Sequence, residues 1–137
     1  MSASGGRPGE SADPERPFPV ICVVEDDASL LRALRRLLCA GGFRVEMFSS
    51  AEGFLLSEQR FRADCLVLDI RLDGMSGLDL QAVLTAAGST VPVVFMTAHD
   101  DPSARERARR AGVVDYLRKP FDDEVLIGAI NRAIGRA

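Results

Sequence analysis

The sequence has no tryptophan, one histidine and three cysteines among its 137 residues. The cysteines, Cys22, Cys39 and Cys65, are odd in number, far apart and set in apolar runs, so they have neither the spacing of a zinc site nor that of a disulfide framework. We expect buried, reduced thiols. The one histidine, His99, cannot form a metal site alone, and we interpret it as a solvated loop residue.

Two further classes of protein are disfavoured by what the chain does not contain. No apolar run approaches the roughly 18 residues that suggest a membrane-spanning helix, so we expect no membrane segment. The net charge of −3 gives no basic excess of the kind that a nucleic-acid-binding protein carries. We therefore expect no direct contact with nucleic acid.

The beginning of the chain differs in composition from the remainder. Residues 1–17 are dominated by Gly, Pro, Ser and charged side chains and lack the apolar stretch of a signal peptide. We predict a disordered N-terminal tail over this range and a cytoplasmic protein. Residues 18–137 have the length of one globular domain that can bury a continuous core.

From residue 18 onward, short apolar runs alternate with helix-like segments. The runs are rich in Val, Ile and Leu, have strand length, and cover about residues 20–24, 43–48, 64–69, 91–96 and 113–117. The helical patterns cover about residues 28–40, 51–60, 77–87, 102–111 and 121–136. This alternation predicts an α/β fold with a parallel sheet covered on both faces, because strands such as "CLVLDI" and "VVFMTA" are apolar almost throughout.

Polar side chains gather where the predicted strands end. They are Glu25, Asp26 and Asp27 after the first run, Asp69 after the third, Thr97 after the fourth and Lys119 after the fifth. Because parallel strands end at the same edge of a sheet, where such sheets bind ligands, we expect these side chains to form one polar site. Crowded carboxylates repel one another, and their oxygens are ligands that Mg²⁺ prefers. The sequence therefore predicts a magnesium site at this edge.

Each of these residues also has an ordinary structural explanation. Asp26 or Asp27 could cap the following helix, and Asp69 could be a turn residue at a strand end. Thr97 could be a solvated loop hydroxyl, and Lys119 could be a surface lysine. Their joint placement at three or four different strand ends favours the functional interpretation.

Four motifs, "VVEDD", "LVLDIRLDGMSGLDL", "VVFMTAHDD" and "YLRKPF", resemble in order and separation the receiver domain of two-component response regulators. The resemblance covers Val20 to Arg136 and is nearest to the nitrogen-fixation and nitrate-response type. It implies a flavodoxin-like, doubly wound (βα)5 domain with a five-stranded parallel sheet in the order 2-1-3-4-5. It also implies a signalling switch rather than an enzyme: a phosphoacceptor that assists its own phosphorylation and dephosphorylation, with a histidine kinase as partner.

The resemblance implies a role in the Mg²⁺ site for four residues. Asp69 matches the phosphoacceptor, which is also a metal ligand, and Asp26 matches the acid that contacts Mg²⁺ directly. Glu25 matches the neighbouring acid that reaches the ion mainly through water, and Arg71 would supply a backbone carbonyl. Asp27 has no role in the family, and we assign it to the start of the helix.

The remaining matched residues concern the phosphoryl group and the switch. Thr97 matches the hydroxyl that hydrogen-bonds the phosphoryl group, Lys119 the lysine that pairs with it, and Tyr116 the ring whose rotamer follows the switch. The chemistry needs these types, because an aspartate that attacks a phosphohistidine forms an acyl phosphate whose charge must be neutralised from two sides. Mg²⁺ would act on one side and Lys119 on the other. The resemblance also implies a cis peptide bond between Lys119 and Pro120.

The resemblance further implies where the signal leaves the domain. When Thr97 moves toward the phosphoryl group, Tyr116 can turn inward and alter the face formed by the fourth helix, fifth strand and fifth helix. We expect phosphorylation to strengthen association through this face, as a weak dimer or by docking to an output protein or domain. The chain stops directly after the last predicted helix, so we expect a stand-alone receiver or an excised regulatory domain.

Two residues depart from the family pattern. Glu25 stands where Asp is commoner, which a water-mediated ligand tolerates because the longer side chain still reaches a hydrated ion. Asp73 stands where many relatives carry Pro, which removes a φ restraint and adds negative charge near the phosphate, so the loop after Asp69 is expected to be less restrained. Arg71 and His99 are expected to flank the entrance of the site.

Three other functions stay open at this point. A flavin-binding domain of the same fold would need Ser, Thr and Gly donors after the first strand, where Glu25 to Asp27 would repel a phosphate. A Mg²⁺-dependent phosphohydrolase would carry its nucleophilic Asp after the first strand, whereas the isolated candidate, Asp69, follows the third. An interaction module that is never phosphorylated is disfavoured by the intact set of acids, Thr and Lys.

Overall fold

Five strands form one parallel sheet in the order β2-β1-β3-β4-β5 in the computed structural model, which describes residues 18–136. The strands are β1 (Val20–Val24), β2 (Arg44–Phe48), β3 (Cys65–Asp69), β4 (Val93–Thr97) and β5 (Asp115–Arg118). The predicted parallel sheet and its strand order are therefore confirmed. The predicted disordered tail, residues 1–17, lies outside the described residues.

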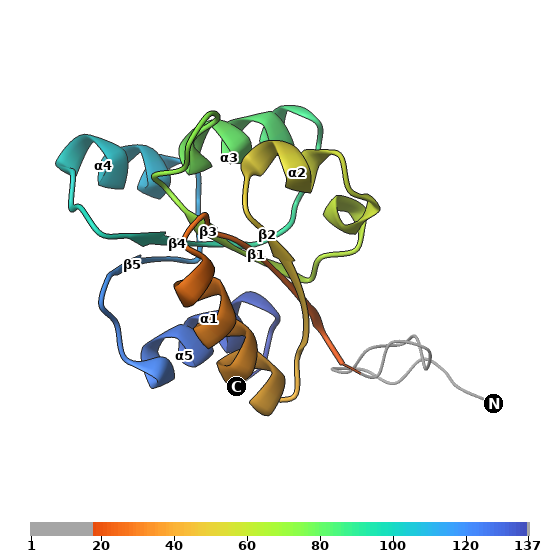
Figure 1. The fold of residues 1–137 in the computed structure, drawn as a ribbon. Helices are drawn as coiled ribbons and strands as arrows, with labels where there is room; N and C mark the ends of the chain where they lie inside the picture. The colour runs from red at the N-terminus through yellow and green to blue at the C-terminus, as the bar shows by residue number, and fades with distance from the viewer. Residues whose placement is uncertain (1–17, 137) are drawn as a thin grey trace.

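Five α-helices and one 3-10 helix, η1, connect or follow these strands within the described range. They are α1 (Ala28–Ala40), α2 (Ala51–Leu55), η1 (Glu58–Phe61), α3 (Gly77–Ala86), α4 (Pro102–Arg110) and α5 (Asp123–Ala133). Figure 1 shows α1 and α5 on one face of the sheet and α2, α3 and α4 on the other, so the domain is doubly wound as expected. No helix within residues 18–136 is both long enough and apolar enough to cross a membrane.

Short polar side chains set where the helices begin. The Asp27 carboxylate accepts hydrogen bonds from the amides of Ser29 and Leu30, so Asp27 is the N-cap of α1, as predicted. Ser50 and Ser76 cap α2 and α3 in the same manner. Each cap satisfies backbone donors that have no partner within the helix. The caps thereby fix how the chain turns from the end of each strand into the next helix.

The prediction of one continuous helix over residues 51–60 is wrong, because the structure has two short helices in this range. The first, α2, ends at Leu55, and Ser57 then takes an extended backbone conformation. The Ser57 hydroxyl accepts a hydrogen bond from the amide of Gln59 and so begins η1 as a separate element. A capping serine inside an apparently continuous helical pattern was the signal for this break.

Strands β4 and β5 each begin two residues later than predicted. Pro92 has no amide hydrogen to donate, so it stands before β4, although its carbonyl accepts from the amide of Leu66. Gly112 has a φ of 75°, and the amide of Val113 returns to the carbonyl of Ala108 at the end of α4. The turn that closes α4 therefore uses the first residues of the apolar run that was assigned to the strand.

The sheet separates two apolar cores. All five residues of β1 are buried, because alternate side chains enter the core on each face. Phe54 and Phe95 lie in the core under α2, α3 and α4, and Leu38 and Leu126 lie in the core under α1 and α5. This rigid two-sided support holds the carboxyl ends of β1, β3, β4 and β5 along one edge.

Candidate functional site

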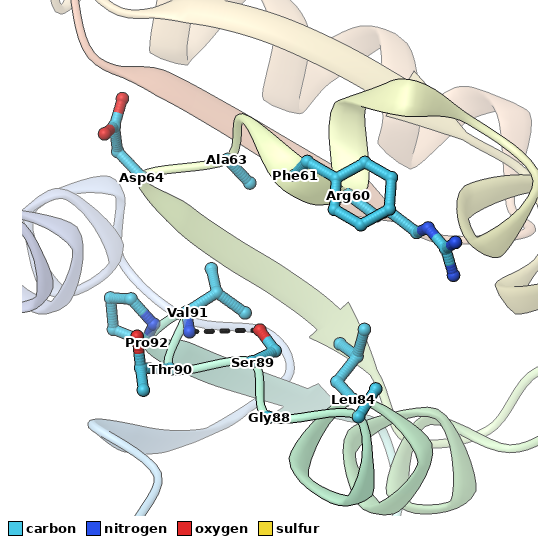
Figure 2. Close-up of a pocket in the computed structure, with 11 residues that line it drawn as sticks. Arg60, Phe61, Ala63, Asp64, Leu84, Gly88, Ser89, Thr90, Val91 and Pro92 are labelled. Carbon is cyan, nitrogen blue, oxygen red and sulfur yellow. Dashed lines mark hydrogen bonds between the residues drawn. The ribbon is translucent and has the colours of Figure 1, made fainter.

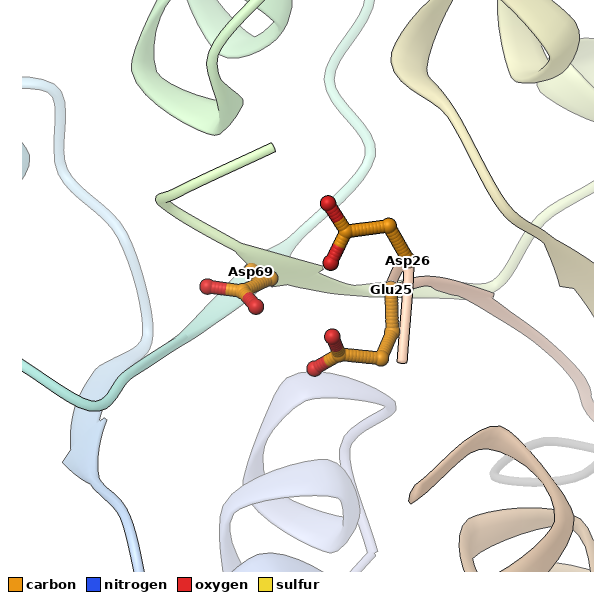
Figure 3. A group of neighbouring side chains, drawn as sticks. All are labelled: Glu25, Asp26 and Asp69. Carbon is orange, nitrogen blue, oxygen red and sulfur yellow. The ribbon is translucent and has the colours of Figure 1, made fainter. Parts of the chain in front are cut away.

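Three carboxylates meet at the carboxyl edge of the sheet. Glu25 and Asp26 follow β1, and Asp69 ends β3, which pairs directly with β1. One oxygen from each lies within 4.8 Å of the others, and Figure 3 shows the three side chains converging from two neighbouring chain segments. Glu25 is 1% exposed and Asp69 is 4% exposed, whereas Asp26 is open to solvent.

Lys119 joins two of these carboxylates. Its ammonium donates to Oε1 of Glu25 at 2.6 Å and to Oδ2 of Asp69 at 2.9 Å. The Lys119 amide donates to the carbonyl of Thr97, and the following bond to Pro120 is cis, which confirms that prediction. Burial alone would lower the pKa of the Lys119 ammonium, but its hydrogen bonds to Glu25 and Asp69 outweigh that effect and raise the pKa.

The Glu25 carboxylate has protein partners on both oxygens. Oε1 accepts from Lys119, and Oε2 accepts from the amide of Asp27 at 3.0 Å. Burial raises the pKa of the Glu25 carboxyl, and the hydrogen bonds from Lys119 and Asp27 oppose that rise. Glu25 therefore positions Lys119 in this structure, while its expected water-mediated contact with Mg²⁺ stays a prediction.

Thr97 lies on β4, which pairs with β3, and Tyr116 lies on β5, which pairs with β4. Thr97 ends β4 and is 1% exposed; its hydroxyl donates to the carbonyl of His99 at 2.9 Å and accepts from the His99 amide at 3.2 Å. Tyr116 is half-buried in β5, and its hydroxyl has no hydrogen-bond partner among the described residues. The Arg105 guanidinium lies 5.3 Å from the centre of the Tyr116 ring. His99 is exposed, as expected.

The loop between β3 and α3 is tied to carboxylates at three points. The amide of Arg71 donates to Oδ1 of Asp69 at 3.0 Å, and the amide of Asp73 donates to Oδ2 of Asp26 at 3.3 Å. Farther along, the amide of Met75 donates to Oε2 of Glu52 at 3.0 Å. These bonds restrain the backbone of the loop on either side of Asp73, and the expected effect of Asp73 on loop rigidity stays a prediction.

Two residues of this region had no assigned role from the sequence. Glu52 lies in α2, and no spacing pattern connects a helix surface residue with a loop that follows another strand. Gly77, at the start of α3, packs so closely on β3 that a Cβ there would lie 2.2 Å from the carbonyl oxygen of Asp69. The "SG" pair before "LDL" was the available signal for such a close approach.

The acid cluster fits a divalent cation. Three carboxylates against one ammonium leave two negative charges without a cationic partner in the cluster. Mg²⁺ takes one or two carboxylates and keeps several waters, and the exposed Asp26 beside the buried Asp69 provides such a half-open donor set. The chemistry of these donors therefore agrees with the predicted magnesium site.

A hollow at the opposite edge of the sheet has a different character. It has a volume of about 520 Å³ and lies among η1, the end of α3 and the starts of β3 and β4 (Figure 2). The Ser89 hydroxyl there accepts from the amide of Val91 at 3.2 Å, and the Asp64 carboxylate accepts from the amide of Val20 at 2.7 Å. These are turn and strand-end contacts, and the cluster of acids with Lys119 is at the other edge.

Comparison with known proteins agrees with this geometry. Residues 21–131 match the family described as response regulator receiver domain. Response regulator protein TodT of Pseudomonas putida is 43% identical over 115 residues, which are 84% of this chain and 51% of TodT. Transcriptional regulatory protein FixJ of Bradyrhizobium diazoefficiens is 37% identical over 117 residues, which are 85% of this chain and 57% of FixJ. The chain spans about half the length of the curated relatives it matches.

Solved structures show the same fold. A response regulator receiver protein from Burkholderia phymatum superposes with a TM-score of 0.74 at 43% sequence identity. The match covers 87% of this chain and 97% of that one. The five-stranded order and the helices on both faces are therefore shared with a protein that is similar over nearly its whole length.

Proposed function

Because this chain belongs to the family of response regulator receiver domains, we propose that Asp69 accepts a phosphoryl group from a phosphohistidine of a histidine kinase. The observation that carries the proposal is the position of Asp69. It is a nearly buried carboxylate, with Asp26 on one side and the Lys119 ammonium on the other. A carboxylate in this place can attack phosphorus while the charge of the transferred group is offset from two sides. The Lys119 ammonium would act on one side, and a cation held at Asp26 would act on the other.

The cation would be held by Asp26, by Asp69 and by the backbone carbonyl of Arg71, with Glu25 reached through water. When bound, Mg²⁺ supplies positive charge to the phosphoryl oxygens. An Asp69 oxygen forms the new bond to phosphorus while the bond from phosphorus to the histidine nitrogen breaks, and the nitrogen keeps that electron pair. The product on the protein is an acyl phosphate.

Two side chains exchange partners during this step. The Lys119 ammonium, which donates to Glu25 and Asp69, turns one of its hydrogens toward a phosphoryl oxygen. The Thr97 hydroxyl gives up the carbonyl of His99 and donates to another phosphoryl oxygen. These exchanges link the chemical event to the loop after β4.

The output of the switch is proposed on the face formed by α4, β5 and α5. Movement of Thr97 leaves space beside Tyr116, and the Tyr116 hydroxyl has no partner here to hold it in place. Helix α4 is rich in arginine, which suits steering of an acidic partner. The face would dock an output protein or domain, or a second copy as a weak dimer, and we propose a cytoplasmic location.

In this proposal the domain acts as a signalling switch and not as an enzyme that converts a separate substrate. The domain also assists its own phosphorylation and dephosphorylation. The nitrogen-fixation and nitrate-response type is a narrower proposal. The likeness to FixJ supports it, although TodT has the higher identity of the two.

Mass spectrometry tests the central step. Incubation with acetyl phosphate or phosphoramidate and Mg²⁺ should add one phosphoryl group, and Asp69→Asn should abolish this adduct, because an amide is a poor nucleophile. Asp122→Asn is the matched control, since Asp122 is exposed and its side chain makes no capping hydrogen bond. Equal labelling with and without Mg²⁺ would contradict the metal role of Asp26.

Amide hydrogen exchange tests the output face. Beryllofluoride with Mg²⁺ mimics the phosphoryl group and should change protection in the segment from Pro102 to Ala133 as well as at the acids. Changes confined to the acid cluster would reject α4, β5 and α5 as the output face.

A further inference from the structure

Glu52 reaches from α2 to a loop that follows a different strand. Its Oε2 accepts a hydrogen bond from the amide of Met75 at 3.0 Å. The same oxygen lies 2.7 Å from the point that a Cβ on Gly74 would occupy. Gly74 has a φ of 78°, so the turn needs glycine for its backbone and leaves room for the carboxylate. The Glu52 carboxylate therefore lies against the Gly74–Met75 turn and accepts a hydrogen bond from it.

The loop that Glu52 holds contains residues of the phosphoryl site. It begins directly after Asp69 and contains Arg71, whose backbone carbonyl is the proposed metal ligand. A second anchor holds it nearer the site, where the amide of Asp73 donates to Oδ2 of Asp26 at 3.3 Å. The loop is thus fixed by two acids from other elements, one inside the cluster and one outside it.

The two anchors differ in how they respond to a cation. Asp26 is a candidate ligand, and a cation on its carboxylate draws charge from the oxygens that accept the Asp73 amide, so that hydrogen bond weakens. Glu52 is not a member of the acid cluster found among the described residues, so its bond to Met75 stays as it is. The outer anchor therefore matters most when the site is loaded.

We propose that Glu52 is a positioning residue for the phosphoryl site, which holds the Gly74–Met75 turn so that the backbone of the loop stays in place for the cation. This inference rests on the proposed function and deepens it. Glu52 acts through Met75 and touches neither the cation nor the phosphoryl group. It takes over the restraint that proline would supply at position 73.

Three variants separate this role from a general effect on stability. Glu52→Ala removes the acceptor, Glu52→Gln keeps an oxygen that can accept from Met75 but removes the charge, and Glu58→Ala is a matched control in η1. Glu58 is exposed and makes only a surface ion pair with Arg62 at 3.9 Å. Each variant is titrated with Mg²⁺ alone by calorimetry, and exchange of the Met75 amide is followed without Mg²⁺. Thermal unfolding of each variant checks that it is folded.

The expected results follow from the hydrogen bond. Glu52→Ala should weaken Mg²⁺ binding roughly fivefold and speed exchange of the Met75 amide roughly tenfold, the effects of losing one hydrogen bond to a carboxylate. Glu52→Gln and Glu58→Ala should stay within about twofold of the wild type in both measurements.

Contrary results identify which idea fails. If the wild type binds Mg²⁺ and Glu52→Ala binds it equally well, the positioning role is rejected and the proposed function is untouched. If Glu52→Gln loses as much affinity as Glu52→Ala, charge rather than the hydrogen bond is responsible, and the positioning role is again rejected. If the wild type binds Mg²⁺ no better than Asp26→Asn does, the metal role in the proposed function fails, and this inference fails with it.

Discussion

The ammonium of Lys119 lies 2.6 Å from Oε1 of Glu25, a side chain that is 1% exposed. The two residues are 94 positions apart in the sequence, and the contact also brings the ammonium to Asp69. Glu25 therefore sets the place of the Lys119 ammonium in this structure.

Lys119→Ala should destabilise the protein and strengthen Mg²⁺ binding. Removing the ammonium leaves Glu25 and Asp69 as nearly buried carboxylates without a cation, at a cost of about 1–3 kcal/mol in the free energy of unfolding. Mg²⁺ should restore part of that loss, because it supplies the missing positive charge. Urea unfolding with and without Mg²⁺ measures both effects.

Arg110→Ala is the control for Lys119→Ala. Arg110 pairs with Glu106 on the exposed side of α4, so its loss should change the free energy of unfolding by less than about 0.5 kcal/mol. Mg²⁺ that stabilises the Lys119→Ala variant no more than the wild type would show that the ammonium and the cation do not share these carboxylates.

Gly77→Ala and Gly128→Ala should have opposite effects on stability. A Cβ on Gly77 would lie 2.2 Å from the backbone carbonyl oxygen of Asp69, so the backbone must shift at a cost of about 2–4 kcal/mol. A Cβ on Gly128, inside α5, would meet only the side chain of Arg132 at 3.7 Å, so alanine should stabilise the helix by roughly 0.5–1 kcal/mol. Urea unfolding of both variants measures the contrast, and equal effects would contradict the packing at Gly77.

Tyr116→Phe should leave the protein as stable or raise its free energy of unfolding by up to about 1 kcal/mol. The Tyr116 hydroxyl is buried without a hydrogen-bond partner among the described residues. Folding removes this hydroxyl from water without giving it a new hydrogen bond, and phenylalanine avoids that cost. The ring stays under the Arg105 guanidinium. Chemical unfolding measures the change, and a loss above about 1 kcal/mol would show that the hydroxyl has a partner.

Iodoacetamide at mildly alkaline pH should modify one cysteine of the folded protein and three in urea. The expectation of buried thiols is wrong for Cys39, which is exposed on α1. It is right for Cys22 and Cys65, where burial raises the pKa of each thiol to about 12, so both stay protonated and inaccessible. Because both pKa values lie above the usual value of 9.0, the two thiols stabilise the fold fully below that pH and lose this effect as the pH rises toward about 12. Mass spectrometry counts the adducts, and rapid modification of Cys65 in the folded protein would contradict its burial.

The fold could be predicted because its determinants are local. Five apolar runs separated by helical patterns imply the parallel sheet, and the placement of Asp26, Asp69 and Lys119 after those runs brings them to one edge. The break after Leu55 was missed because apolar periodicity says nothing about a hydroxyl that competes for backbone donors, as Ser57 does. The contact of Glu52 with Met75 depends on how two loops approach in space, which no spacing in the chain encodes.

Of the 17 basic side chains in the sequence, Lys119 is the only lysine; all the others are arginine. Lysine supplied with ¹⁵N at its side chain therefore enters the chain at one position, and that position lies between Glu25 and Asp69. A nuclear magnetic resonance spectrum of such a sample contains a single ammonium signal, with no assignment to make. Lys119 thus serves as a single isotopic reporter beside the proposed phosphoacceptor Asp69, readable without any added dye or mutation.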